Sequence, residues 1–300
     1  MRAFYEKDGI AIHLCDNMDL LSRMEDESVN LIYCDILYNT GKKFDDYNDN
    51  LGSPEEAVEW YRPRFVKMKR VLAANGSIFI HCNWRLDSYI RILMDQIFGG
   101  NNFRNRIYRK HSKERGFHKN FDSQVDIILY YVKDSTNFVF HEQYSNKEHA
   151  DPLFENGYVE GRSDPRFCDG MLIDLEKINK HWLVSKKDFS FMQAKGEIII
   201  INGLPYRLSK VVPIGNLWAE EVMLDKYERT TVAEAYDTPK PEAVLERIIE
   251  SCSNPGDVVA DFFLGGGTTA VVTKKLGRKG IFCDISKKAC EVTVKKINEI

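Results

Sequence analysis

Apolar runs and amphipathic segments alternate along the first third of the chain. The short run GIAIHL and the continuous run VNLIYC are typical of strands, and a helical pattern lies between them around Leu20, Leu21 and Met24. Pro54, with Ser53 before it, predicts the start of a helix that runs to about residue 74. Further on, we expect the strand SIFIHC, a helix over residues 86–98, and the strands FRNRIYR and VDIILYYV.

The same βα rhythm returns at the C-terminal end. There we expect a helix over PEAVLERIIESC, a strand over GDVVADFF, a helix over TTAVVTKKLG, a strand over GIFCDI and a helix over KKACEVTVKKINEI. Between about residues 134 and 236 the pattern weakens to short β-like pieces such as EIIII. Alternating strands and helices predict an α/β fold with a doubly wound, parallel, Rossmann-like sheet. Its halves would be residues 1–133 and 237–300, with residues 134–236 inserted between them.

Composition places the 300-residue chain among ordinary globular proteins, with 43% hydrophobic and 29% charged residues. No apolar run approaches the roughly 20 residues of a membrane span, and the N-terminus lacks a signal-peptide core, so we expect a cytoplasmic location and no membrane partner. The seven cysteines show no CxxC pair or zinc-ligand spacing, which argues against a disulfide framework or structural metal.

A glycine turn stands between a strand and a helix in VVADFFLGGGTTAVV. Gly265, Gly266 and Gly267 would let a ligand approach the backbone, and the helix opened by Thr268 would point N–H groups at it. The next strand ends in Asp284, where a carboxylate can reach ribose hydroxyls. A turn that merely packs helix on strand is the alternative, but the strand–turn–helix–strand–acid order favours a nucleoside cofactor. The turn does not match the P-loop pattern, so the sequence gives no support for ATP or GTP hydrolysis. It does not match GxGxxG either, which argues against a NAD-dependent oxidoreductase.

A second candidate site follows the apolar strand VNLIYC. Asp35 ends this strand, and Tyr38 lies three residues on. An acid beside an aromatic ring could hydrogen-bond an exocyclic amine and stack on its ring; equally, the acid could cap a turn and the tyrosine pack beside it. These residues alone do not decide between the two.

The segment VNLIYCDILYNTG resembles the catalytic segment of amino-methylating DNA methyltransferases, a strand followed by Asp-Pro-Pro-Tyr. Further similar stretches follow in the family's order: HLCDNMDLLSRMEDESVN, SIFIHCNWRLDSYIRILMDQIFGG, KNFDSQVDIILYYVK and TPKPEAVLERIIESCSNPGDVVADFFLGGGTTAVVTKKLGRKGIFCDIS. The resemblance covers roughly two thirds of the chain. It is closest to the circularly permuted β-class, which includes type III modification subunits, because the catalytic strand precedes the cofactor glycines.

Two departures from the family pattern stand out. Ile36 and Leu37 replace the two prolines, and Asp261-Phe-Phe-Leu-Gly-Gly-Gly267 replaces Asp-Pro-Phe-x-Gly-Ser-Gly. The second keeps small residues at the turn. The first removes two rigid residues and raises the entropic cost of holding the loop, which leaves a catalytically inactive DNA-binding paralogue as an alternative.

The resemblance implies transfer of a methyl group from S-adenosylmethionine to an exocyclic amine of a flipped-out DNA base. Asp35 and the carbonyl of Ile36 would accept the amine hydrogens, and Tyr38 would stack on the base. The implied cofactor residues are Asp16, Asp35, Lys240, Asp261, Phe263, Gly265, Gly267, Thr268 and Asp284. Asp16 and Asp284 could instead cap helices, and Lys240 could simply be exposed.

The target base is expected to be adenine, at N6. No cysteine follows a proline, which argues against cytosine-C5 chemistry, and an aspartate at the first motif position leans toward adenine N6. Cytosine N4 remains the first alternative. The resemblance leaves open a homodimer and a cognate restriction endonuclease as partners.

Residues 104–119 carry seven basic residues and one acidic residue, a local charge of +6. The formal net charge is −3, so the rest of the chain carries −9. A solvated loop is the usual meaning of such a run. This basic stretch, however, lies between two expected strands beside the expected catalytic face. That position favours a surface that contacts DNA phosphates, with double-stranded DNA as the partner. The residues are Arg104, Arg106, Arg109, Lys110, Lys113, Arg115 and Lys119. Sequence recognition is expected from residues 134–236.

Overall fold

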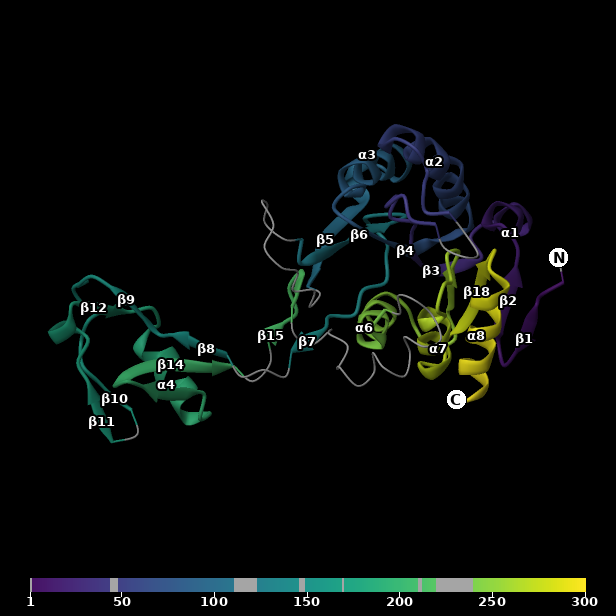
Figure 1. Cartoon of the computed structure of the whole chain (residues 1–300). Helices are drawn as coiled ribbons and strands as arrows, with labels where there is room; N and C mark the ends of the chain where they lie inside the picture. Colours follow the sequence, from purple (N-terminus) through teal and green to yellow (C-terminus); the bar gives the residue numbers. More distant parts are fainter. Residues whose placement is uncertain are drawn as a thin grey trace. The chain divides into compact units, whose positions relative to one another are not determined.

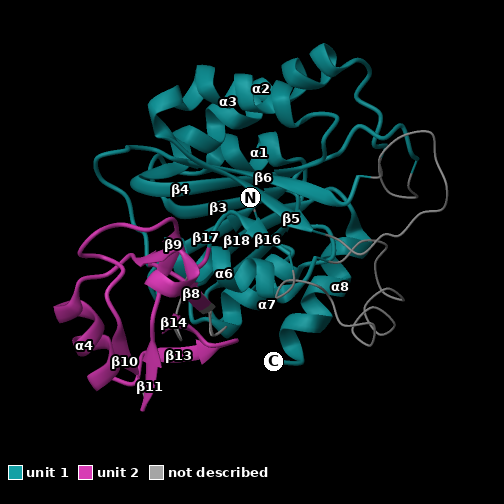
Figure 2. Ribbon diagram, turned by 90° about the vertical axis from the view of Figure 1, so that its left-hand side faces the viewer, with its two compact units in different colours: residues 1–141, 215–300 teal, residues 142–214 magenta. Residues whose placement is uncertain are grey.

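The structure is a computed structural model that describes residues 2–43, 48–110, 123–145, 149–168, 170–209, 212–219 and 240–300. The chain divides into two compact units (Figure 2). Unit 1 comprises residues 1–141 and 215–300, and unit 2 comprises residues 142–214. Unit 2 lies inside the stretch 134–236 that we expected to be an insert, with borders eight and 22 residues further in. Its expected role in recognition stays a prediction.

Unit 1 contains a large mixed sheet with helices on both faces (Figure 1). Its strands are β1 (Tyr5–Lys7), β2 (Ile10–Leu14), β3 (Val29–Asp35), β4 (Leu72–Cys82), β5 (Phe103–Lys110), β6 (Val125–Val132), β16 (Leu217–Trp218), β17 (Val258–Asp261) and β18 (Lys279–Asp284). Its helices are α1 (Asn17–Arg23), α2 (Pro54–Val71), α3 (Asp87–Phe98), η1 (Gly100–Asn102), α6 (Glu242–Cys252), α7 (Thr268–Lys275) and α8 (Lys287–Asn298).

Within the described part of the chain, the order in this sheet is β1-β2-β18-β17-β3-β4-β6-β5-β16. Strands β2, β18, β17, β3 and β4 are parallel neighbours, so their carboxyl ends meet at one edge. The expected all-parallel sheet was wrong at β1 and β6, which run antiparallel to their neighbours. Antiparallel pairing of β5 with β6 fits their connection, because the crossover helix that a parallel pair requires is not part of the sequence pattern there.

Two apolar cores hold the helices on the sheet. On one face, Cys34, Ile78 and Ile80 belong to the cluster that also contains buried residues of α1, α2 and α3. On the other, Ile12 and Phe282 pack with residues of α7 and α8. The α/β, doubly wound architecture is therefore confirmed.

Helix α2 begins and ends by clear local signals. Ser53 and Glu56 form a capping box at its N-terminus, as the Ser-Pro pair predicted. The expected end near residue 74 was wrong: Leu72 is already extended and pairs with Val29 of β3, so β4 starts directly after the helix.

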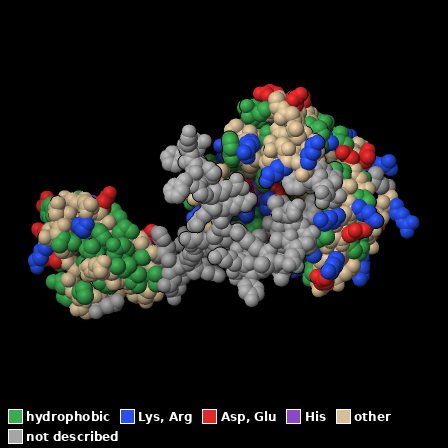
Figure 3. All heavy atoms as spheres, in the orientation of Figure 1, with side chains coloured by type: hydrophobic (Ala, Val, Ile, Leu, Met, Phe, Trp, Pro, Cys, Tyr) green, Lys and Arg blue, Asp and Glu red, His purple; other side chains and the backbone are tan. Residues whose placement is uncertain are grey.

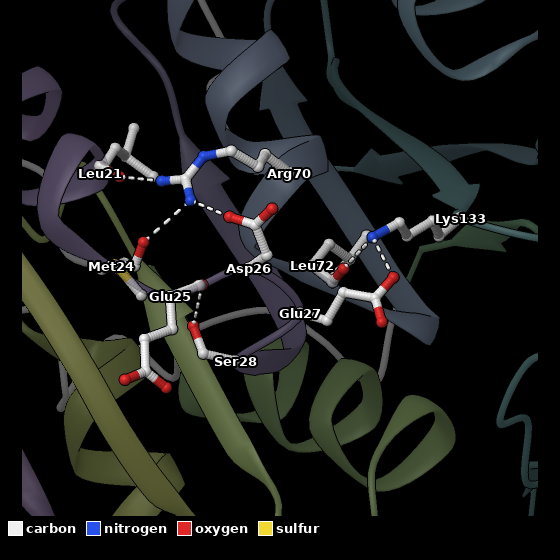
Figure 4. Close-up of polar contacts among 9 residues, drawn as sticks. All are labelled: Leu21, Met24, Glu25, Asp26, Glu27, Ser28, Arg70, Leu72 and Lys133. Atoms are coloured by element: carbon white, nitrogen blue, oxygen red, sulfur yellow. Dashed lines mark hydrogen bonds and ion pairs between the residues drawn. The ribbon is translucent and has the colours of Figure 1, made fainter.

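The turn before β3 is fastened by two basic residues (Figure 4). Arg70 donates to the carbonyl of Met24 at 2.9 Å and also pairs with Asp26. Lys133 lies 3.0 Å from the carboxylate of Glu27. Because β3 begins right after this turn, these contacts fix the start of the strand that ends at Asp35.

Unit 2 has its own small core around Trp182, Phe189 and Ile198. Its elements are β7 (Tyr144–Ser145), β8 (His149–Pro152), β9 (Phe154–Asn156), β10 (Arg166–Cys168), β11 (Met171–Ile173), η2 (Glu176–Ile178), β12 (Lys180–Trp182), α4 (Lys186–Ala194), β13 (Ile198–Ile201), β14 (Leu204–Ser209) and β15 (Val212–Pro213). Strands β13, β14 and β8 form its three-stranded sheet, and β7 pairs with β15 where the chain enters and leaves the unit. In the described residues, no helix is both long and apolar enough to cross a membrane.

Candidate active site

The carboxyl edge of the parallel strands gathers the polar residues expected from the sequence. Asp284 ends β18, Asp261 ends β17 and Asp35 ends β3, three neighbouring strands. His81, next to the end of β4, is the register partner of Asp35. This edge is therefore where the fold places its candidate chemistry.

Asp35 lies between an aromatic ring and a cation. The hydroxyl of Tyr38 donates to Oδ1 of Asp35 at 2.8 Å, and Nζ of Lys240 lies 2.6 Å from Oδ2. The same ammonium is 5.2 Å from the centroid of the Tyr38 ring. A quarter of the Asp35 side chain remains exposed, and each carboxylate oxygen keeps a second lone pair for a ligand. Burial, and then the charge of Asp35, raises the pKa of Tyr38 well above its usual value, so the phenol stays protonated.

The loop after Asp35 is held in place without prolines. The buried hydroxyl of Tyr61 donates to the carbonyl of Leu37 at 2.9 Å, and the amide of Asn83 donates to the carbonyl of Tyr38 at 3.2 Å. The Ile36 side chain is buried in the core, and its N–H bonds to the carbonyl of His81. No hydrogen bond among the described residues engages the Ile36 carbonyl, which leaves it available as an acceptor.

Asp49 anchors the part of this loop around Asn39 and Thr40. Its carboxylate accepts from the N–H groups of Asn39 and Thr40 at 2.9 and 3.0 Å, although its side chain is nearly buried. Asn39 in turn accepts from the N–H of Leu51 at 2.7 Å. Such bonds supply the order that two prolines would have given.

A row of polar side chains runs across the sheet from Tyr33, on the same strand as Asp35. Tyr33 bonds Nδ1 of the fully buried His81 at 2.8 Å, and Nε2 of His81 lies 3.5 Å from Asp126, which Arg109 contacts at 2.7 Å. Burial lowers the pKa of His81 and keeps the ring neutral. Burial alone would raise the pKa of Asp126, but His81 and Arg109 outweigh it and hold that pKa well below its usual range.

The glycine turn is shaped by two aspartates. Asp261 is buried and accepts from the hydroxyl of Thr269 at 2.7 Å and from the N–H of Phe263 at 2.9 Å. Asp284 accepts from the N–H of Gly265 at 2.8 Å. Burial raises the pKa of Asp261 to about 7. Both carboxylates thus fix the backbone between β17 and α7, and Asp284 also keeps part of its surface open.

Glycine is required at position 267. Its φ is +78°, and a Cβ there would lie 2.2 Å from Oγ1 of Thr293 on α8. This close approach sets the distance between α7 and α8.

Asp16 caps α1 and faces Arg64. Its carboxylate accepts from the N–H of Met18 at 2.7 Å and lies 3.5 Å from Arg64, whose guanidinium stacks on Trp60. Nearly half of the Asp16 side chain is exposed, so capping and ligand contact are compatible. Phe263 is half-buried, with its ring 6.3 Å from that of Trp60.

Comparison with known proteins decides the family. A model of the DNA methylase family, covering N6 and N4 methyltransferases, matches residues 29–295. The chain belongs to this family.

Among relatives of this DNA methylase, the Type II methyltransferase M.EcaI of Enterobacter cloacae is 28% identical over 94% of the chain and 68% of the relative. The DNA adenine methyltransferase YhdJ of Escherichia coli is 27% identical over 94% of the chain and 81% of the relative. The Type III StyLTI Mod subunit of Salmonella typhimurium is 24% identical, and the match spans 53% of its length.

Solved structures agree on the fold. M1.HpyAVI superposes with a TM-score of 0.55 at 17% identity, over 96% of this chain and 98% of the other. The PvuII methyltransferase, described as cytosine-N4-specific, gives 0.57 at 12% identity over 99% and 97%. The expected family and methyltransferase fold are confirmed; the β-class order of its parts stays a prediction.

The structure places two of the expected site residues of this methylase in ion pairs. Lys240, expected at the cofactor, contacts Asp35, which is itself expected both at the target amine and at the cofactor, so the role of Lys240 stays a prediction. Arg109, expected on the DNA surface, is 9% exposed and ion-paired with Asp126, so we leave it out of that surface. Lys110 is exposed, whereas Arg104 and Arg106 are partly exposed, and Arg106 lies 3.4 Å from the carboxylate of Asp87. Lys113, Arg115 and Lys119 lie outside the described residues.

Several residues of the site were missed from the sequence. Asn83 directly follows the strand SIFIHC, a position at the carboxyl edge that could have drawn notice. Tyr61 sits inside an amphipathic helix and Asp49 inside a polar loop, where their hydrogen bonds leave no sequence signal.

Proposed function

We propose that this DNA methylase transfers a methyl group from S-adenosylmethionine to the N6 amine of a flipped-out adenine in double-stranded DNA. The observation that carries the proposal is the pairing of Asp35 with Tyr38 at the carboxyl edge of β3, beside the free carbonyl of Ile36. Adenine is favoured over cytosine because one relative matched over most of both chains is named a DNA adenine methyltransferase.

The chain's own residues would prepare the amine. An exocyclic amine is a weak nucleophile because its lone pair is delocalised into the ring. Asp35 and the Ile36 carbonyl would accept its two hydrogens and favour the form whose lone pair points away from them. Tyr38 would stack on the base and fix its plane. Because the amine is engaged in base pairing within a duplex, the base must first leave the stack.

The cofactor contributes an activated methyl group when bound. Carboxylates and an aromatic ring at the edge of β2, β17 and β18 suit a nucleoside: Asp284 and Asp16 offer acceptors for ribose hydroxyls and an adenine amine, and Phe263 offers an apolar face. Gly265, Gly267 and Thr268 would border the methionine end, with the buried Asp261 holding their turn.

The well-held loop favours an active enzyme over an inactive paralogue. Tyr61, Asn83 and Asp49 supply the order lost with the prolines, so the departure at Ile36 and Leu37 does not argue against catalysis. We further propose that Arg104, Arg106 and Lys110 contact DNA phosphates. We also propose that the protein forms a homodimer, acts beside a cognate restriction endonuclease and is located in the cytoplasm, where it would meet DNA. The endonuclease is supported by one relative, which is named a restriction-modification enzyme subunit.

One labelling experiment tests the function. The protein is incubated with S-adenosylmethionine labelled on its methyl group and DNA of mixed sequence, and the DNA is digested to nucleosides. Label in N6-methyl-2′-deoxyadenosine is expected. Label in N4-methyl-2′-deoxycytidine would overturn the adenine assignment, and no label at all would favour a DNA-binding paralogue. Asp35→Ala should bind DNA normally and transfer no methyl group; unchanged transfer would remove Asp35 from the mechanism.

A further inference from the structure

The turn after β4 presents an exposed indole. It lies beside the loop that follows Asp35 and contains Tyr38, which we call the catalytic loop. Trp84 is 56% exposed, although tryptophan side chains are normally well covered. Its neighbours Cys82 and Leu86 are fully buried, so the turn itself is tightly packed. The exposed ring therefore belongs to an ordered segment.

Asn83 ties this turn to the catalytic loop. Its amide donates to the carbonyl of Tyr38 at 3.2 Å, while its Oδ1 accepts from the N–H of Arg85 at 3.0 Å. Asn83 is itself 6% exposed. Trp84 stands between these two anchored residues, so its backbone position is fixed relative to Tyr38.

A cation accompanies the ring. The guanidinium of Arg85 lies 4.6 Å from the Trp84 ring centroid. An aromatic face next to an arginine suits a ligand that combines flat rings with phosphates, as a nucleic acid does. In the view of Figure 3, Lys and Arg side chains are spread over the surface of unit 1.

We propose that Trp84 inserts its indole into the DNA stack at the position left by the flipped target base, with Arg85 contacting an adjacent phosphate. This inference rests on the proposed function, because it needs a base that leaves the helix. Apolar and aromatic side chains that fill such a gap offset the cost of unstacking. Asn83 would then couple the wedge to the loop that receives the base.

The test compares paired and weakened targets. Sequencing the modified bases in DNA from cells that express the protein gives its recognition site. Duplexes with this site carry either thymine or an abasic position opposite the target adenine. We expect Trp84→Ala to slow single-turnover methylation at least tenfold on the paired duplex and less than threefold on the abasic one, because the target there is already unpaired. Trp84→Phe should keep most of the rate. Phe4→Ala removes another exposed ring of unit 1, just before the edge strand β1, which four strands separate from β4, and serves as the control.

Two results would overturn the wedge: an unchanged rate on the paired duplex, or an equal loss on both duplexes. Thermal melting confirms that the variants are folded. A second measurement does not depend on methyl transfer. Stacking on bases should quench the Trp84 fluorescence, so DNA should quench the wild type clearly more than Trp84→Phe. Equal quenching overturns the wedge, whereas a wild type that is quenched but transfers no methyl group overturns the proposed function alone.

Discussion

The ammonium of Lys240 lies 2.6 Å from Oδ2 of Asp35 and 5.2 Å from the centroid of the Tyr38 ring. It therefore orients the two side chains that would hold the target base. We expect Lys240→Met to lower kcat roughly tenfold or more, since a charge-assisted hydrogen bond is worth about 1.5–3 kcal/mol. Binding of S-adenosylmethionine, measured by calorimetry, should change less than threefold. A loss confined to cofactor affinity would instead support a role of Lys240 in binding the cofactor.

Tyr61 should matter for rate more than for folding. Tyr61→Phe keeps the buried ring but removes the hydroxyl that bonds the Leu37 carbonyl. We expect a several-fold drop in kcat and a loss of about 1 kcal/mol in the free energy of unfolding. Tyr131→Phe, which removes a similar hydroxyl bonded to Asp95, should cost comparable stability and leave kcat unchanged. If both variants keep full activity, the loop does not depend on this brace.

The buried carboxyl of Asp261 predicts a pH-dependent stability. Its pKa of about 7 in the fold lies above the ordinary value of 3.8, so the folded state binds the proton more tightly. The resulting stabilisation is complete below about pH 4 and is lost as the pH rises through 7. Asp261→Asn cannot ionise. Between pH 5 and 8 the free energy of unfolding of the wild type should therefore fall relative to that of Asp261→Asn, by on the order of a few kcal/mol. Urea denaturation across this range measures the difference, and a constant difference would contradict the assignment.

Gly267 should tolerate no side chain. Gly267→Ala places a methyl group 2.2 Å from Thr293 Oγ1 in a backbone region that disfavours alanine. We expect a loss of about 3 kcal/mol, the sum of backbone strain and overpacking. Gly256→Ala is the matched control, because Gly256 has a similar φ of +87° with open space around it. It should cost only about 1 kcal/mol; equal melting temperatures of the two variants would exclude a steric role.

Lys110 and Arg109 are neighbours in sequence with different expected roles. Lys110→Ala should weaken DNA binding at all sequences and reduce the salt dependence of binding by about one charge. Arg109→Ala should instead destabilise the fold by about 3 kcal/mol, because it leaves the carboxylate of Asp126 buried without its arginine. Binding isotherms at several salt concentrations, with melting curves alongside, separate the two. A reduced salt slope for Arg109→Ala in a fully stable protein would return Arg109 to the DNA surface.

The sequence predicted what depends on local pattern. VDIILYYV forms β6 over Val125–Val132, and the Ser53-Pro54 pair starts α2. It could not predict the direction of β6, because periodicity reports burial and not the orientation of the neighbouring strand. It also missed β16, since two residues are too short to show a pattern.

For the site, strand ends identified Asp35, Asp261 and Asp284, because the carboxyl edge of a parallel sheet follows from strand order. The burial of Arg109 could not be anticipated in the same way. Its charge is satisfied by Asp126, which lies 17 residues away on the facing strand, and a count of basic residues treats paired and free side chains alike.

The chain enters unit 2 through β7 and leaves it through β15. These strands pair with each other, Tyr144 with Pro213 and Ser145 with Val212. Its two ends are therefore neighbours, and among the described residues its core cluster is built from residues of unit 2. The whole segment could therefore be replaced through two crossovers, one in β7 and one in β15, without disturbing the register of the large sheet. Unit 2 could then change in length and sequence while the strands that carry the candidate site keep their places.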